Sequence, residues 1–274
     1  MISRTEADVN SLIKNLRSTW GDLRQDFLDL LQPRRDYAPG RLTREERYAV
    51  DALKRDGYVV IPNYFSRDYA FQLRDRLEAT LVDGVSREYD CGAYLRVWDD
   101  RAYDEGVRRL YHVERLFPEL KSHRFNPFPQ RVASAYYRTA IHTNMLIFQH
   151  NTKSNANTRY HHVDSFCKEF KSFVYLDDVD EGNGPFTYIR GSHKNIYRRL
   201  KKQILGNKTG SPTSLYEKDI KMLLKDETKI LGPAGTLILA DVRGIHRGSP
   251  QTERSRSVLV NYMLRHEGDI FLDR

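Results

Sequence analysis

Apolar side chains recur every three or four positions through the highly charged first fifty residues, which is the spacing of one buried helix face. Proline and glycine then end this pattern. A short β-branched stretch at 57–62 predicts a strand, and Ser66 is placed to cap a following helix. The apolar positions of the two helices are Leu12, Leu16, Trp20, Leu23, Phe27, Leu30 and Leu31, and then Leu73, Leu77 and Leu81.

Short apolar runs alternate with turns in the second half of the chain. We predict a helix near 130–139 and strands at 144–149, 173–176, 186–189, 236–240 and 258–263. Two charged, weakly periodic segments, 84–125 and 194–229, are interpreted as insertions over the surface. Helices followed by a series of short strands indicate an α+β chain with a mainly β core, a double-sheet barrel flanked by N-terminal helices.

Composition narrows the class of protein. The aromatic content of 11% excludes a disordered chain, and no apolar run approaches the ~18 residues of a membrane span. Two cysteines in 274 residues do not make a disulfide scaffold. The polar start has no secretory signal, so we expect a cytoplasmic protein. The net charge of +8 leaves nucleic acid, an anionic membrane or an acidic substrate open as partners.

A candidate metal site emerges from the spacing of three side chains. His162 and Asp164 lie two positions apart, so in an extended segment both point to the same side. His246 follows a buried strand in a tight polar loop. Two histidines and one carboxylate leave three positions open on a metal, which is the facial triad of non-haem Fe(II) oxygenases. Five other histidines have no partner at such a spacing: His112, His123, His142, His150 and His266.

A charged side chain follows the third candidate ligand. Arg256 lies on the strand after His246, and a guanidinium fork can bond both oxygens of a carboxylate. This arrangement would suit an acidic ligand bound beside the metal.

These residues, in this order, resemble the phytanoyl-CoA dioxygenase-like family. The resemblance rests on His162-x-Asp164, the turns at 182–186 and 191–194, His246-x-Gly248-Ser249-Pro250, and Arg256. It covers about residues 57–265. It implies a double-stranded β-helix in a single oxygenase domain over 1–274, with a helical extension at 1–56. It also implies Fe(II), 2-oxoglutarate and O2 as metal, co-substrate and oxidant.

The resemblance assigns roles position by position. His162, Asp164 and His246 would be the iron ligands, and Arg256 would bind the distal carboxylate of 2-oxoglutarate. Gln149 would help to hold the other end of the co-substrate, and Phe173 would lie beside it. The interval from His246 to Arg256 is one residue shorter than the family's, so Arg254 competes for the same role.

The roles of three further residues near these motifs need separate interpretation. Arg190 stands where the family usually has proline, and its side chain either reaches the site or faces water. His193 is interpreted as a structural residue of its turn. His161 would point to the opposite face from His162, which leaves open a supporting or a substrate-facing role.

The implied reaction is hydroxylation of an unactivated C–H bond of a small metabolite, with release of succinate and CO2. Desaturation, epimerisation or ring formation with the same cofactors is the first alternative, and a non-catalytic ligand- or protein-binding barrel is the second. Asp164 argues against a halogenase, which needs that position open for chloride.

The basic stretch 194–208 is either a solvated helix face or a lid that attracts an anionic substrate. Nucleic acid is disfavoured as a partner, because only Tyr197 interleaves with the charges. The identity of the substrate and the oligomeric state do not follow from the sequence.

Overall fold

The computed structural model describes residues 40–81, 84–98, 106–153, 160–164, 168–195, 214–215 and 217–270. The expected helix over 12–31 and most of the basic stretch 194–208 lie outside these ranges. The described helices are α2 (Arg44–Asp56), α3 (Arg67–Glu78), α4 (Lys121–Arg124), α5 (Pro127–Tyr137) and α7 (Glu217–Ile220). Short 3-10 helices occur at Ala79–Leu81, Val113–Arg115, Pro118–Leu120, Ser192–Asn195 and Leu224–Asp226.

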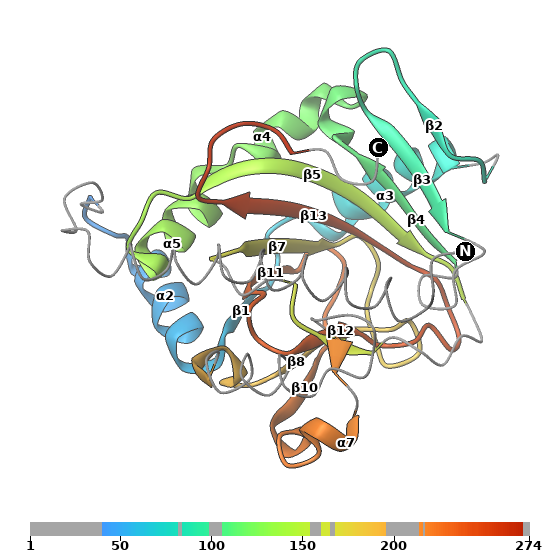
Figure 1. The fold of residues 1–274 in the computed structure, drawn as a ribbon. Coiled ribbons are helices and arrows are strands. Elements are labelled where there is room, and N and C mark those ends of the chain that lie inside the picture. The colour runs from blue at the N-terminus through green and yellow to red at the C-terminus, as the bar shows by residue number, and fades with distance from the viewer. Residues whose placement is uncertain are drawn as a thin grey trace, which may run out of the picture.

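Two antiparallel sheets form the core. The larger has the order β1 (Tyr58–Ile61), β11 (Leu237–Asp241), β7 (Phe170–Tyr175), β13 (Arg256–Leu264), β5 (His142–Asn151), β4 (Val107–Tyr111), β3 (Tyr94–Trp98) and β2 (Arg87–Glu88). The smaller has the order β10 (Glu227–Ile230), β8 (Phe186–Ile189), β12 (His246–Gly248), β6 (His161–His162) and β9 (Ser214–Leu215). The larger sheet curves over the smaller one (Figure 1). This jelly-roll confirms the expected mainly β barrel with few helices.

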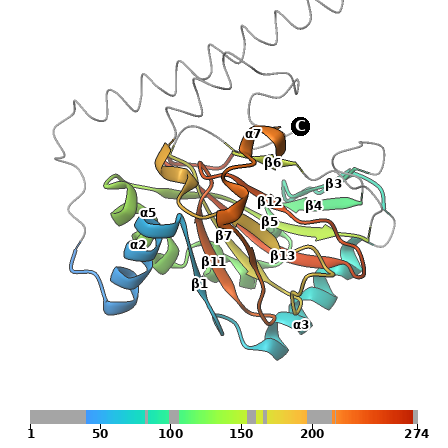
Figure 2. The ribbon, with the colours of Figure 1, turned by 90° about the horizontal axis from the view of Figure 1, so that it is seen from below.

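The strands of the larger sheet other than β2 present alternate side chains to two different cores, as the pleat requires. On β7, Phe170 and Val174 pack into the cluster beneath the helices, whereas Phe173 and Tyr175 belong to the cluster between the sheets. Residues of α2, α3 and α5 complete the outer cluster, so these helices cover the outer face of the larger sheet (Figures 1 and 2). The inner face is thereby free to line a site between the two sheets.

Local signals explain where the first described elements begin and end. Thr43 and Glu46 form a reciprocal capping box at the start of α2, and Gly57 ends that helix with a φ of 91° before β1. Ser66 caps α3 as predicted, accepting a hydrogen bond from the backbone of Tyr69. No helix in the described ranges is long and apolar enough to cross a membrane.

The interpretation of 84–125 as an irregular surface excursion is wrong. This segment contributes β2, β3 and β4, which extend the larger sheet beyond β5. Tyr94, Leu95, Leu110 and Tyr111 are buried there. Arg96 in β3 and the adjacent Arg108 and Arg109 in β4 interrupt the apolar residues, so the strands lack the apolar alternation on which the prediction relied. The other charged segment also includes a barrel strand, because β10 begins at Glu227 and pairs with β8.

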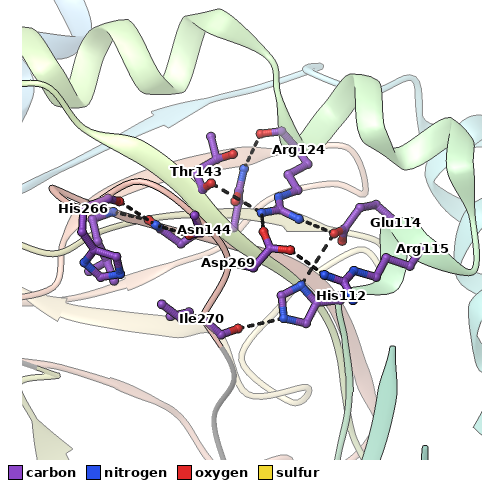
Figure 3. Close-up of polar contacts among 12 residues, drawn as sticks. His112, Glu114, Arg115, Arg124, Thr143, Asn144, His266, Asp269 and Ile270 are labelled. Atoms are coloured by element: carbon purple, nitrogen blue, oxygen red, sulfur yellow. Dashed lines mark hydrogen bonds and ion pairs between the residues drawn. The ribbon is translucent and has the colours of Figure 1, made fainter. Parts of the chain in front are cut away.

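A buried ionic network fixes the segment that follows β13 (Figure 3). Arg124 bonds both Glu114 and Asp269, and Arg115 bonds Asp269 as well, at 2.5 Å. His112 Nε2 donates to the carbonyl of Ile270 at 2.8 Å, because a carbonyl can only accept. The chain after β13 is therefore held against α4 and the end of β4.

Candidate metal centre

The three candidate ligands converge between the sheets. His162 on β6 and His246 on β12 are direct cross-strand partners, and Asp164 lies just beyond the end of β6. His162 Nε2 lies 3.5 Å from Asp164 Oδ1, and His246 Nε2 lies 3.4 Å from Asp164 Oδ2. One ligand atom from each residue falls within 4.8 Å of the others. The sequence spacing and the strand register thus bring all three side chains to one point.

Backbone carbonyls fix the orientation of both imidazoles. His162 Nδ1 donates to the carbonyl of Tyr160 at 3.0 Å, and His246 Nδ1 donates to that of Gly244 at 2.9 Å. Each histidine therefore bonds the carbonyl two residues before it. Because Nδ1 carries the proton in this arrangement, Nε2 keeps its lone pair and faces the centre. Sequence reasoning did not anticipate these two bonds.

Hydrogen bonds between loops hold the ligands in register. The backbone N–H of Asp164 donates to the carbonyl of Val242 at 3.1 Å. Ser192 Oγ accepts from the backbone of Ile245 at 2.7 Å, immediately before His246. His193 in the same turn is buried and lies outside the triad. The Gly-Ser-His turn therefore positions the third ligand through its serine.

A lysine that sequence reasoning missed occupies the same site. Lys171 on β7 donates to Asp164 Oδ2 at 2.7 Å, and its ammonium lies 3.7 Å from the centre of the Tyr262 ring. The side chain is 7% exposed. Strand alternation could have found it, since Lys171 must share a face with Phe173. Which residue it contacts depends on how the two sheets stack.

The charges of the site keep the carboxylate ionised. Burial favours a higher pKa for Asp164, but the positive charge of Lys171 and the interactions with the two histidines outweigh it and hold that pKa well below its ordinary value. Burial lowers the pKa of His246. For His162, burial acts in the same direction, but the hydrogen bond and charge of Asp164 outweigh it and raise the pKa. An ionised carboxylate is the form in which this side chain binds a metal.

The donor set fits a divalent first-row metal. Two imidazole nitrogens and one carboxylate oxygen on one side leave further coordination positions open, as in non-haem iron oxygenases. Among the residues that the structure describes, these three are the only such convergent group of histidine, cysteine or acidic side chains. His162 is 36% exposed, so the centre can be approached from its side.

The structure distinguishes the two competing arginines. Arg256 begins β13, is only 5% exposed and donates to the carbonyl of Gly184. Burial lowers the pKa of its guanidinium. Arg254 precedes the strand, so strand alternation does not apply to it; it is exposed and forms an ion pair with Asp180. Arg256 is therefore the arginine enclosed in the barrel.

Some of the remaining candidate residues face the space between the sheets, and the others point away from the triad. Gln149 and Phe173 lie on the inner face, where the Phe173 ring centre is 4.7 Å from that of Phe186. His161 turns away from the triad, and its Nε2 bonds Glu227 at 2.6 Å. Arg190 is exposed, near Asp226. His112, His123, His142, His150 and His266 take no part in the triad.

Comparisons with known proteins agree on one family and one fold. The phytanoyl-CoA dioxygenase family profile matches residues 53–258. No curated protein sequence matches the chain. Among solved structures, it is similar to EctD from S. alaskensis with bound Fe, at 17% identity and a TM-score of 0.61, covering 83% of this chain and 82% of that one.

Two further neighbours come from nogalamycin biosynthesis. The non-heme alpha ketoglutarate dependent carbocyclase SnoK is 17% identical, with a TM-score of 0.57 and coverage of 83% of this chain and 86% of that one. The epimerase SnoN is 14% identical, with a TM-score of 0.56 and coverage of 80% and 82%. At these identities the likeness is one of fold. Because the family profile spans most of the chain, the protein belongs to the phytanoyl-CoA dioxygenase family.

Proposed function

We propose that the protein is an Fe(II)- and 2-oxoglutarate-dependent hydroxylase of a small molecule. The single observation that supports this most strongly is the convergence of His162, Asp164 and His246 within 4.8 Å. The family uses Fe(II), 2-oxoglutarate and O2. Bound together, these would supply the oxidation of an unactivated C–H bond, with release of succinate and CO2.

The chain's own residues would bind and orient the metal and the co-substrate and would enclose them. The Nε2 atoms of His162 and His246, held by their Nδ1 bonds, would ligate the metal with Asp164. Arg256 would bind the distal carboxylate of 2-oxoglutarate, because its buried guanidinium can bond both oxygens. The metal and Arg256 would then offer positive charge to the two carboxylates of the co-substrate.

The path between these two ends follows the inner face of β7. Lys171, Phe173 and Tyr175 follow one another on that face. They run from the triad toward Val258 of β13, which comes two residues after Arg256. Phe173 therefore lies between the two proposed ends of the co-substrate, where its ring would exclude water. Gln149 lies on the same face of β5, opposite Val258 of β13.

Hydroxylation is the simplest outcome for an intact triad. Asp164 occupies the position that a halogenase leaves open, so chloride has no place at the metal. Epimerisation or ring closure uses the same ligands, and solved neighbours include an epimerase and a carbocyclase. Incorporation of one 18O atom from 18O2 into the product would support hydroxylation, and an unlabelled product would show that the reaction is one of these alternatives.

Spectroscopy tests the proposal without a known substrate. Anaerobic addition of Fe(II) and 2-oxoglutarate should give a weak visible charge-transfer band. His162→Ala should abolish this band, whereas His161→Ala should keep it, because His161 lies on the opposite face. A band that survives His162→Ala would overturn the site. Absence of any band in the native protein would favour a non-catalytic ligand-binding barrel.

A further inference from the structure

The turn that follows β11 contacts two of the three candidate ligands through its backbone. The carbonyl of Val242 accepts a hydrogen bond from the backbone N–H of Asp164 at 3.1 Å, and the carbonyl of Gly244 accepts one from His246 Nδ1 at 2.9 Å. These carbonyls lie two residues apart in the chain, whereas the ligands that they hold come from different segments. The shape of the turn 241–244 therefore sets how the two ligands lie relative to each other.

The side chain of Asp241 closes this turn. Its Oδ1 atom accepts a hydrogen bond from the backbone N–H of Arg243 at 3.0 Å. The Asp241 carbonyl accepts one from the backbone N–H of Gly244, also at 3.0 Å. An aspartate whose side chain bonds the backbone two residues ahead forms an Asx turn. One side chain thus fixes the backbone from which both carbonyls project.

The Asp241 carboxylate is itself held from two sides. Arg243 Nε donates to Oδ1 at 3.0 Å, and Arg243 Nη2 donates to Oδ2 at 2.8 Å. The hydroxyl of Tyr136, on α5, donates to Oδ2 at 2.7 Å. The Arg243 guanidinium in turn lies 4.8 Å from the centre of the Tyr137 ring. The carboxylate is fully buried, so these donors take the place of water around it.

The charge of Arg243 keeps Asp241 ionised in this buried position. Burial favours a higher pKa for Asp241, but the charge and hydrogen bonds of Arg243 outweigh it and lower that pKa. Asp241 lies outside the convergent triad, and both of its oxygens bond Arg243 or Tyr136. Its chemistry is therefore suited to shaping the turn and not to binding the metal.

Tyr188 of β8 packs against the same turn. Its hydroxyl donates to the carbonyl of Asp241 at 2.8 Å, and its ring is nearly parallel to that of His246, at 13°. A Cβ atom at Gly244 would overlap the Tyr188 hydroxyl, so the turn approaches β8 as closely as a glycine allows. The turn is therefore held on one side by Tyr188 and on the other by its own carboxylate.

We propose that Asp241 is a positioning residue of the metal centre. Its carboxylate, held by Arg243 and Tyr136, fixes the turn whose carbonyls orient two of the three metal ligands. This inference rests on the proposed function, because it takes the triad as a metal site. Removing a group that orients metal ligands typically weakens metal binding 10- to 100-fold.

Two double variants separate the shape of the turn from the ion pair. Asp241→Asn/Arg243→Met keeps a side-chain oxygen that can accept the backbone N–H, whereas Asp241→Ala/Arg243→Met has none. Both variants remove the two opposite charges together, so neither leaves a buried charge without its partner. We expect the Kd for Ni(II), measured by calorimetry, to rise about tenfold or more in the alanine variant. In the asparagine variant it should rise about threefold or less.

Arg124→Met is the control, because it breaks another buried ion pair, with Glu114, that contacts none of the three ligands. It should lower the urea midpoint of unfolding and leave the Kd for Ni(II) unchanged. Tyr136→Phe, which loses one hydrogen bond to Asp241 and no charge, should raise that Kd about threefold and decides if the alanine variant does not fold. Equal Kd values in the two double variants, a rise in Arg124→Met as large as in the alanine variant, or no rise in Tyr136→Phe would overturn the inference.

The charge-transfer band of the native protein with Fe(II) and 2-oxoglutarate separates this inference from the proposed function. A native band together with equal Kd values in the two double variants would overturn the positioning role and leave the hydroxylase proposal intact. Ni(II) affinities in the expected order without a native band would support the positioning role and overturn the proposed function. A native protein that binds no Ni(II) would overturn both.

Discussion

The ammonium of Lys171 lies 2.7 Å from the Oδ2 atom of Asp164, a proposed metal ligand, and both side chains are largely buried. Lys171 lies on a strand of the larger sheet and Asp164 in the loop that follows β6 of the smaller sheet, so this ion pair links the two. Removing one partner of a buried ion pair leaves the other charge without compensation. In the metal-free protein, Lys171 therefore supplies the cation that Asp164 needs.

Lys171→Met should strengthen metal binding. Two cations that share one carboxylate repel each other by several kcal/mol even at an effective dielectric constant of about 20, which exceeds the typical benefit of an orienting hydrogen bond. We expect the Kd for Ni(II), measured by calorimetry, to fall at least about tenfold, and the metal-free variant to unfold at lower urea concentration. Lys229→Met, an exposed lysine on β10, is the control. Weaker Ni(II) binding would show that Lys171 acts mainly by orienting Asp164.

Arg256→Gln should weaken 2-oxoglutarate binding about 10- to 100-fold, because the co-substrate loses a charge-assisted, two-bond contact. Arg254→Gln should leave it unchanged, since Arg254 is exposed and paired with Asp180. Titration of the charge-transfer band with 2-oxoglutarate measures the affinity of each variant for the co-substrate. The reverse order of effects would assign the anchor to Arg254.

Arg124→Met should destabilise the fold by about 3–5 kcal/mol, because it leaves the buried Glu114 carboxylate without its cation. Arg76→Met removes an exposed ion pair with Glu119 and should cost less than about 1 kcal/mol. Urea unfolding monitored by fluorescence gives both values. Similar losses in the two variants would mean that the network of Figure 3 contributes little to stability.

His123 should make stability depend on pH. Burial lowers its pKa to about 4 from an ordinary value of 6.5. The unfolded chain therefore binds the proton first, and stability present above pH 6.5 is lost as the pH falls toward 4, by about 3 kcal/mol. His123→Phe keeps an aromatic ring near Tyr64 and Phe65 and should flatten this part of the profile. An equal slope in both proteins between pH 4 and 6.5 would contradict the assignment.

Sequence patterns predicted the strands whose apolar residues dominate both faces. The stretch 186–189 is β8 to the residue, and 57–62 contains β1. The sequence patterns did not predict β3 and β4, because Arg96 and Arg109 point inward there and break the apolar alternation. In those strands, charged residues lie on the inner face of the larger sheet, so polarity there did not indicate surface.

The candidate ligands could be predicted because two of them lie on one short segment and the third follows a recognisable strand. Lys171 and the choice between Arg254 and Arg256 could not. They depend on how the two sheets stack and on the residue at which β13 begins. Neither property is local to a sequence window, so only the tertiary structure determines it.

The most direct test is the anomalous diffraction of crystals grown anaerobically with Fe(II) and 2-oxoglutarate. The account predicts one iron peak bonded by His162 Nε2, His246 Nε2 and an Asp164 oxygen, with the distal carboxylate of 2-oxoglutarate on Arg256. An iron peak bonded by other residues, or 2-oxoglutarate bound away from Arg256, would contradict it.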